Sequence, residues 1–228
     1  NWALLYASRE AIAEKRQLCV VFCLSPAFLR AAPRHYLFML RGLESLEKTL
    51  ADKNIPFFVL QGGPSDTLPA FLSRIDASKI VTDFDPLRLK REWKDSLARL
   101  LPSVPFHEVD THNVVPCRFV SDKKEYAAYT LRPRIHRQLA EFLDTFDSLR
   151  KHPHPWKGPS PRNDWRNLLS SHLQTDSNTS ALPTPGEKAS RRALKKFIDQ
   201  TLSDYHDKKT DPNADATSRL SHYLPLAQ

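Results

Sequence analysis

Short apolar runs and longer amphipathic segments alternate along the first two thirds of the chain. Leu18 to Leu24 is an unbroken apolar run closed by Ser25-Pro26, which is typical of a strand covered on both faces in a parallel sheet. Residues 56–60 form a second such run. The segment between them places its apolar residues on one helical face, which predicts a βαβ unit with a right-handed crossover. The residues of that face are Tyr36, Met39, Leu40, Leu43, Leu46 and Leu50.

The same alternation continues to about residue 150. Further strands are expected at 79–83 and 106–110, and amphipathic helices at 1–16, after Gly62-Gly63 and after Asp85-Pro86. Asp85 is predicted to cap the helix that follows it. A last helix is expected over 131–150, and the fold class is therefore α/β with a parallel sheet. The inward residues predicted for that last helix are Ile135, Leu139, Phe142, Leu143 and Phe146.

Beyond residue 150 the composition changes. Residues 152–161 are rich in proline and are expected to form an extended linker, with a short helix over 164–173 after it. Residues 174–185 form a polar tract that contains the sequon Asn178-Thr179-Ser180. A helix is expected after Pro185-Gly186-Glu187, and Asp211 to Leu224 places hydroxyls and an arginine at the start of what the pattern predicts as another helix.

Composition narrows the classes of function. The chain has 228 residues, a net charge of +8 and a pI near 9.5, which favours an anionic partner, nucleic acid first. No apolar run approaches the roughly 20 residues that span a bilayer, so no membrane association is expected. The three cysteines lack metal-ligand spacing, which indicates reduced thiols and a nuclear or cytoplasmic protein.

Candidate catalytic groups follow the predicted strands. Asp83, Asp110 and His112 stand near carboxyl ends of strands, where open α/β sheets bind ligands. Their spacing matches no metal template, and no serine nucleophile elbow is present. We therefore expect capping and loop hydrogen bonds there, and we assign no catalytic residue and no metal ligand. The diglycine Gly62-Gly63 lacks the remainder of a P-loop and is predicted to be a turn.

Several stretches together resemble the class II cyclobutane-pyrimidine-dimer DNA photolyases of the photolyase/cryptochrome superfamily. Their order and spacing carry the resemblance, which runs along most of the chain. The stretches are Asn1-Trp2-Ala3-Leu4-Leu5-Tyr6-Ala7, Arg34-His35-Tyr36, Phe38-Met39-Leu40-Arg41-Gly42-Leu43, Thr82-Asp83-Phe84, Pro86-Leu87-Arg88, Asp110, His112-Asn113-Val114-Val115-Pro116, Ser121-Asp122-Lys123, Glu125-Tyr126 and Pro185-Gly186-Glu187.

The resemblance implies a domain organisation and two cofactors. It implies a Rossmann-like α/β antenna domain over 1–150, a connector over 151–185, and the first helices of an all-α FAD-binding domain over 186–228. FAD is the implied cofactor, with an antenna chromophore of unspecified identity, and damaged DNA is the implied partner of a monomer. The positions that match the family's FAD-phosphate motif are Tyr205, Thr217, Ser218, Arg219, Leu220 and Ser221.

The implied reaction is light-driven repair, in which the excited, reduced flavin donates an electron to a flipped-out pyrimidine dimer. The sequence also departs from the family pattern. The family has a central strand before the Asn1 helix, an arginine where Tyr129 stands and a proline where His222 stands. Its catalytic glutamate, lesion-stacking aromatics and relay tryptophans are expected after Gln228. We therefore expect a truncated photolyase that neither retains FAD nor repairs DNA by itself.

Two other functions stay open at this point. The chain could be a non-catalytic α/β module that binds a nucleotide or a chromophore. It could also be a basic DNA-binding protein derived from a photolyase, which would bind through phosphate contacts, weaken steeply with salt and ignore damage.

Overall fold

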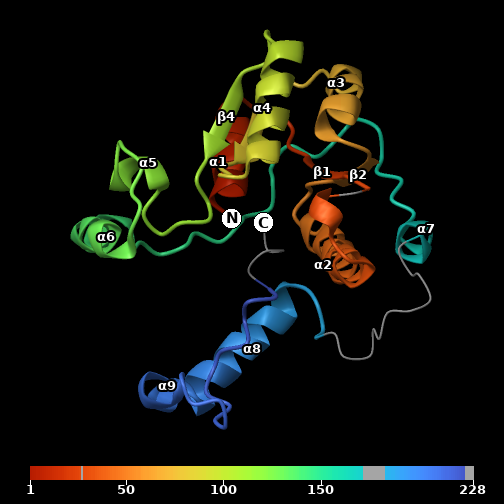
Figure 1. Cartoon of the computed structure of the whole chain (residues 1–228). Coiled ribbons are helices and arrows are strands. Elements are labelled where there is room, and N and C mark those ends of the chain that lie inside the picture. The colour runs from red at the N-terminus through yellow and green to blue at the C-terminus, as the bar shows by residue number, and fades with distance from the viewer. Residues whose placement is uncertain (27, 172–182, 224–228) are drawn as a thin grey trace. The chain divides into compact units, whose positions relative to one another are not determined.

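The structure is a computed structural model that describes residues 1–26, 28–171 and 183–223 (Figure 1). The chain divides into two compact units, one of residues 1–26 with 53–161 and the other of residues 27–52 with 162–228. The first unit contains every described strand, and the second unit is helical. The α/β class predicted from the sequence is confirmed.

Four parallel strands form the framework of the first unit. β1 (Val20–Leu24) pairs with β2 (Phe57–Gln61), and Val20 lies opposite Phe57. β3 (Ile80–Asp83) pairs with β4 (Phe106–Val109) in the same parallel sense. The apolar runs therefore predicted both the strands and their direction. The helices of this unit are α1 (Trp2–Ala13), α3 (Pro64–Arg74), α4 (Arg88–Leu100), α5 (Cys117–Val120) and α6 (Ala128–Phe142).

The strands form two sheets of two rather than one sheet of four. Among the described residues β1 pairs only with β2, and β3 only with β4. Val20 to Cys23 are consequently half-buried, although their unbroken apolar run predicted cover on both faces.

An aromatic cluster forms a core beside β1 and β2. Phe58 packs on Phe71 of α3 with ring centroids 4.9 Å apart, and Leu72 completes the buried cluster. Trp156 packs on the same Phe58 ring at 5.8 Å. Since Trp156 lies in the proline-rich segment, that segment contributes to the core of the first unit although it forms no helix or strand.

His152 fixes the start of the proline-rich segment. Its side chain is 1% exposed, and its backbone N–H donates to the carbonyl of Lys53 at 2.8 Å. The Asn54 side-chain amide donates to the His152 carbonyl at 3.0 Å. Further on, the Lys157 N–H donates to the side-chain oxygen of Gln17 at 2.5 Å. These contacts attach residues 152–157 to the same unit as the strands.

Two predicted boundaries were wrong. α6 ends at Phe142, so Leu143 and Phe146 do not face inward from a longer helix and are 67% and 55% exposed. Phe146 instead packs against Trp2 of α1, with ring centroids 4.5 Å apart. α4 begins at Arg88, so Asp85 is not its cap residue.

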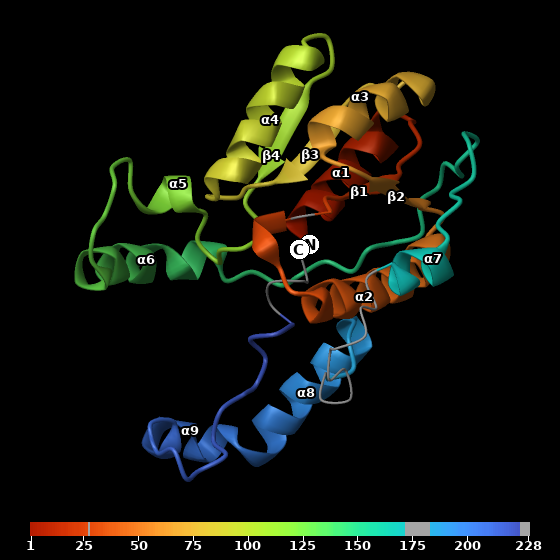
Figure 2. The ribbon, with the colours of Figure 1, turned by 45° about the vertical axis from the view of Figure 1, so that its right-hand side comes forward.

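The second unit is built from helices that hydrogen-bond and pack at a few points. Glu47 accepts hydrogen bonds from the side chains of Asn163 and Trp165, which joins α2 to α7. Phe197 of α8 contacts Tyr205 of α9 edge-on at 5.7 Å, and both views show α9 directly after α8 (Figure 2). The elements are η1 (Phe28–Arg30), α2 (Pro33–Ala51), α7 (Trp165–Ser170), α8 (Glu187–Gln200) and α9 (Leu202–Lys208).

The backbone conformation of Gly186 accounts for the glycine in the Pro185-Gly186-Glu187 stretch of the second unit. It precedes α8 with φ of 94°, a backbone conformation that side chains with a Cβ rarely adopt. A Cβ there would meet the Ser45 side chain of α2 at 3.6–3.7 Å, an ordinary contact, so the backbone conformation is what favours glycine. The glycine therefore allows the chain to turn into α8 at this point.

Some predictions lie outside the described residues. These are the end of the 164–173 helix, most of the polar tract with its sequon, and the last five residues. Within the described residues, no helix is both long and apolar enough to cross a bilayer.

Candidate functional site

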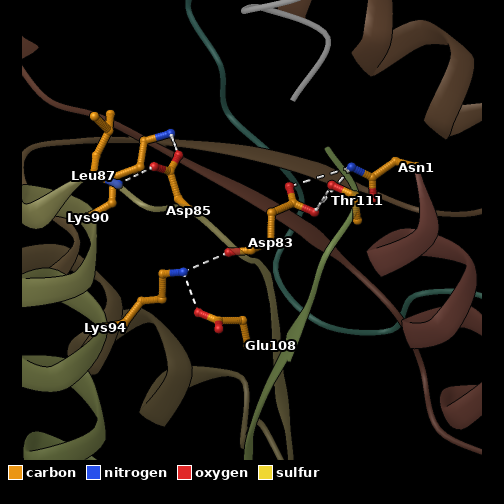
Figure 3. Close-up of polar contacts among 8 residues, drawn as sticks. All are labelled: Asn1, Asp83, Asp85, Leu87, Lys90, Lys94, Glu108 and Thr111. Atoms are coloured by element: carbon orange, nitrogen blue, oxygen red, sulfur yellow. Dashed lines mark hydrogen bonds and ion pairs between the residues drawn. The ribbon is translucent and has the colours of Figure 1, made fainter. Parts of the chain in front are cut away.

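The carboxyl ends of β3 and β4 bring several polar side chains together (Figure 3). Asp83, the last residue of β3, accepts a hydrogen bond of 2.8 Å from the Thr111 hydroxyl, which follows β4. It also accepts one of 3.3 Å from the side-chain amide of Asn1. The Asn1 oxygen in turn accepts the Leu4 N–H at 2.9 Å and caps α1. Asp83 thus ties the start of α1 to the ends of two strands.

Asp85 is the most buried carboxylate at this edge, at 7% exposed. It accepts the Leu87 N–H at 2.9 Å and pairs with the Lys90 ammonium at 2.6 Å. Burial pushes the pKa of Asp85 upward, but the hydrogen bonds from Lys90 and Leu87 together outweigh it and hold the pKa below its ordinary value. Asp85 is therefore ionised at neutral pH and shapes the turn into α4.

Lys94 of α4 connects the two strands of the pair. Its ammonium donates to the Asp83 carbonyl at 2.8 Å and to the Glu108 carboxylate of β4 at 2.5 Å (Figure 3). The Arg118 guanidinium lies 3.5 Å from the other oxygen of Glu108. These cations neutralise the acidic side chains locally.

Asp110 and His112 belong to the loop after β4. Asp110 accepts backbone N–H groups of His112, Asn113 and Cys117 at 2.8–3.3 Å, so it organises the loop. The Nε2 atom of His112 is buried and has no hydrogen-bond partner in the described part of the chain. No group of three or more His, Cys, Asp or Glu among the described residues is arranged to hold a metal ion.

The geometry at this edge is structural. Asp83 and Asp110 accept N–H or O–H groups that fix a strand end and a loop, as the sequence predicted, and Asp85 accepts the Leu87 N–H in the turn before α4. The sequence did not identify Asn1 and Thr111 as partners of Asp83. The available signals were an asparagine before an amphipathic helix and a hydroxyl directly after a strand.

Among the described residues, no hydrogen bond or ring contact joins Tyr205 to the other candidate flavin residues, Thr217 to Ser221. Tyr205 lies on α9, 39% exposed, between the Phe197 ring and the Lys209 ammonium, which is 5.4 Å from the Tyr205 ring. Thr217, Arg219 and Ser221 are exposed, and Ser218 and Leu220 are half-buried.

The stretch from Thr217 to Ser221 does not open a helix. It is irregular, and a turn follows at 221–223, so the predicted helix is absent from the described residues. Arg219 adopts a φ of 51° and pairs with Asp215 at 2.9 Å. The Ser218 hydroxyl accepts the Leu220 N–H at 3.4 Å. Hydroxyls and a guanidinium are suited to phosphate oxygens, but within residues 183–223 no helix begins beside them.

A comparison with known protein families identifies the family of the chain. The family model described as DNA photolyase matches residues 1–156, which include all four strands. The chain belongs to the DNA photolyase family. The candidate flavin residues of this photolyase chain lie after the matched residues.

Curated relatives match the photolyase chain over its whole length. The "Deoxyribodipyrimidine photo-lyase" of Potorous tridactylus is 41% identical over 231 residues, covering 100% of this chain and 43% of the relative. The protein of the same name from Arabidopsis thaliana is 37% identical over 238 residues, covering 100% and 48%. The chain thus spans a little under half the length of these relatives.

Solved structures show the same fold. A bacterial class III photolyase from Agrobacterium tumefaciens superposes with a TM-score of 0.78 at 19% identity, covering 97% of this chain and 47% of that one. An archaeal photolyase from Sulfolobus tokodaii, solved with two FAD molecules, superposes with a TM-score of 0.64 at 16% identity, covering 97% and 48%. At these identities the likeness concerns the fold of the photolyase chain alone.

Proposed function

We propose that this chain belongs to a deoxyribodipyrimidine photo-lyase of class II. Such an enzyme uses light and a reduced flavin to split cyclobutane pyrimidine dimers in DNA. The observation that carries the proposal is the 41% identity with a deoxyribodipyrimidine photo-lyase along the entire chain. The class assignment rests on the motifs between Asn1 and Glu187. Residues 1–150 are the antenna domain of the proposal, 151–185 the connector and 186–228 the start of the flavin-binding helices.

The residues present fit one part of FAD. The hydroxyls of Thr217, Ser218 and Ser221 and the Arg219 guanidinium would hold its phosphates. When bound, FAD supplies the electron that splits the dimer. The isoalloxazine ring requires a site closed on nearly every side, and these residues lie on an exposed, irregular stretch.

The energetic balance opposes retention of FAD by these 228 residues alone. Exposed hydrogen bonds to phosphate contribute about 1 kcal/mol each. Ordering a backbone residue costs about 1–2 kcal/mol, so the gain and the cost are comparable before the ring is counted. We therefore expect the isolated 228-residue chain to lose FAD on gel filtration and to show no light-dependent repair.

The remaining parts of the proposal follow from the same family assignment. The partner is damaged DNA, and the protein acts as a monomer in the nucleus or the cytoplasm. An antenna chromophore of unspecified identity would be the second cofactor. A visible spectrum of the purified chain would report either pigment.

Complementation tests the repair function. The gene that carries this sequence, expressed whole in a photolyase-deficient bacterium, should raise survival after ultraviolet irradiation under blue light and not in the dark. Equal survival in light and dark, with the protein present at normal levels, would contradict the proposal. Stoichiometric FAD on the isolated 228-residue chain would contradict only the energetic argument.

A further inference from the structure

Half of the net charge of the chain is concentrated around α5 and α6. Between Arg118 and Arg137 stand six arginines and lysines and two acidic residues, a net charge of +4 against +8 for all 228 residues. One of the acidic residues, Glu125, accepts the Ser121 hydroxyl at 3.0 Å and pairs with Arg134 at 3.4 Å. Hydrogen bonds from Thr130 and then Ser121 lower the pKa of Glu125, so this carboxylate stays ionised. It is already bonded to neighbouring side chains. The remaining cations therefore dominate the surface.

The exposed positions of α6 follow its helical period. None of the fifteen described residues of α6 is buried, and Leu131 and Ile135 are half-buried. Tyr129, Arg132 and His136, which are three and four positions apart, are exposed and share one face. That face thus presents an aromatic ring and cationic groups in one row, and Figure 1 shows α5 alongside α6.

Two tyrosines on this surface are unusually exposed. Tyr126 is 86% exposed and Tyr129 is 80% exposed. The Lys124 ammonium lies 4.9 Å from the centre of the Tyr126 ring, which places a cation and a flat aromatic face together. Large aromatic rings left in water, interleaved with cations, are the elements that bind unstacked bases and their phosphates.

We propose that this α5–α6 surface, made up of Lys124, Tyr126, Tyr129, Arg132, His136 and Arg137, binds single-stranded nucleic acid. Tyr126 and Tyr129 stack on bases, and Lys124, Arg132 and Arg137 contact phosphates. Charge complementarity favours nucleic acid over a protein partner, and the exposed rings favour a single strand over a duplex, whose bases are already stacked. The inference rests on the proposed function only in naming DNA as the natural ligand. Binding at this surface requires neither flavin nor light.

Binding is measured by fluorescence anisotropy of a labelled oligo-dT in the dark, without added flavin. The wild-type chain should bind with an affinity that falls steeply with salt. Each of Tyr126→Ala and Tyr129→Ala should weaken binding about 5- to 150-fold, the range for loss of one stacked base. Arg132→Ala with Arg137→Ala should reduce the salt slope by about 1.4.

Matched controls separate this surface from general attraction to a basic protein. Leu202→Ala removes a large exposed apolar side chain of α9, and Lys195→Ala with Lys196→Ala removes two exposed cations of α8. Both should bind oligo-dT within about twofold of wild type. An abasic oligonucleotide of equal length should bind wild type and the tyrosine variants alike, and circular dichroism should show all variants folded.

Several results would overturn the proposal. The first is that the wild-type chain does not bind oligo-dT at low salt. The second is that the α8 and α9 control variants lose as much affinity as the tyrosine variants. The third is that a duplex binds more tightly than oligo-dT and that the tyrosine substitutions do not change its affinity. Oligo-U in place of oligo-dT shows whether the surface distinguishes RNA from DNA. A failed complementation test with intact oligo-dT binding would contradict the repair function and leave this surface standing.

Discussion

The Lys79 ammonium, at the start of β3, lies 2.6 Å from a carboxylate oxygen of Glu10 on α1. A Glu14 oxygen, at the residue that follows the end of α1, lies at the same distance. The hydrogen bonds that Lys79 donates to the two carboxylates, to Glu10 first, raise the pKa of Lys79, and the bond to Glu10 lowers the pKa of Glu10. One cation therefore holds the C-terminal end of α1 against the β3–β4 pair.

The Lys79–Glu10 pair predicts a stability that depends on pH at its acid end. Because the folded pKa of Glu10 lies below its ordinary value of 4.5, its contribution is present above that pH and is lost as the pH falls through the folded pKa. The melting temperature of Glu10→Gln should lie below that of wild type from pH 6 to 8, and the difference should shrink as the pH falls through the folded pKa of Glu10. A difference that stays constant as the pH falls through this pKa would show that the pair does not titrate as described. Because Glu92 pairs with Arg88 on the exposed side of α4, Glu92→Gln is the matched control.

Gly186 and Gly42 provide a pair of opposite predictions in the second unit. Gly186→Ala should lower the free energy of unfolding by about 1–3 kcal/mol, since alanine must adopt a positive-φ, extended conformation that is essentially restricted to glycine. Gly42 lies inside α2, and a Cβ there would meet its nearest neighbours at 3.9–4.0 Å, an ordinary contact. Gly42→Ala should therefore raise stability by about 0.5–1 kcal/mol. Urea unfolding of both variants tests the signs, and a destabilising Gly42→Ala would mean that α2 has less room than described.

The three cysteines should differ in reactivity. Burial raises the pKa of Cys19 to about 12, and burial also raises the pKa of Cys23. Cys117 is exposed, but desolvation and then the Asp110 carboxylate raise its pKa. A disulfide reagent at pH 8 should label Cys117 alone in the folded chain, and Asp110→Asn should accelerate that labelling. Labelling of Cys19 or Cys23 without denaturant would contradict the described burial.

His152 predicts resistance to trypsin at the Lys151–His152 bond. Cleavage requires local opening, and the His152 backbone and side chain are bonded and buried. His152→Ala removes the imidazole packing and should cost about 1–2 kcal/mol, so the bond should be cut about 5–30 times faster. His154→Ala, at a half-buried neighbour, should change the rate little. Mass mapping of early fragments gives the rates, and rapid cleavage in the wild type would refute the anchor.

Local chemistry explains which elements were predictable. The runs at Leu18–Leu24 and 56–60 predicted β1 and β2 because short apolar runs bounded by turn residues are typical of strands in a parallel sheet. The same kind of pattern failed at Leu143 and Phe146, which continue the helical period after α6 has ended. Phe146 finds its partner in Trp2, a contact across most of the unit that periodicity does not encode.

The candidate sites divide in the same way. The carboxylates at Asp83 and Asp110 were located correctly because strand ends and turn residues are local signals. The partners of the flavin candidates could not be predicted, since they depend on which helices surround Thr217 to Ser221. Composition predicted an extended segment after residue 150 and could not reveal that Trp156 packs on Phe58, almost a hundred positions away.

The Trp156–Phe58 contact decides where this protein can be cut for expression. A boundary at residue 150, where the composition changes, would remove the indole that covers Phe58 and the histidine that bonds to Lys53. The truncated product would expose an aromatic ring of β2, and in the part of the chain that the structure describes each strand pairs with a single neighbour, which favours aggregation. A boundary after Pro161, where the first unit ends, keeps both contacts, so a truncated product should include the proline-rich segment.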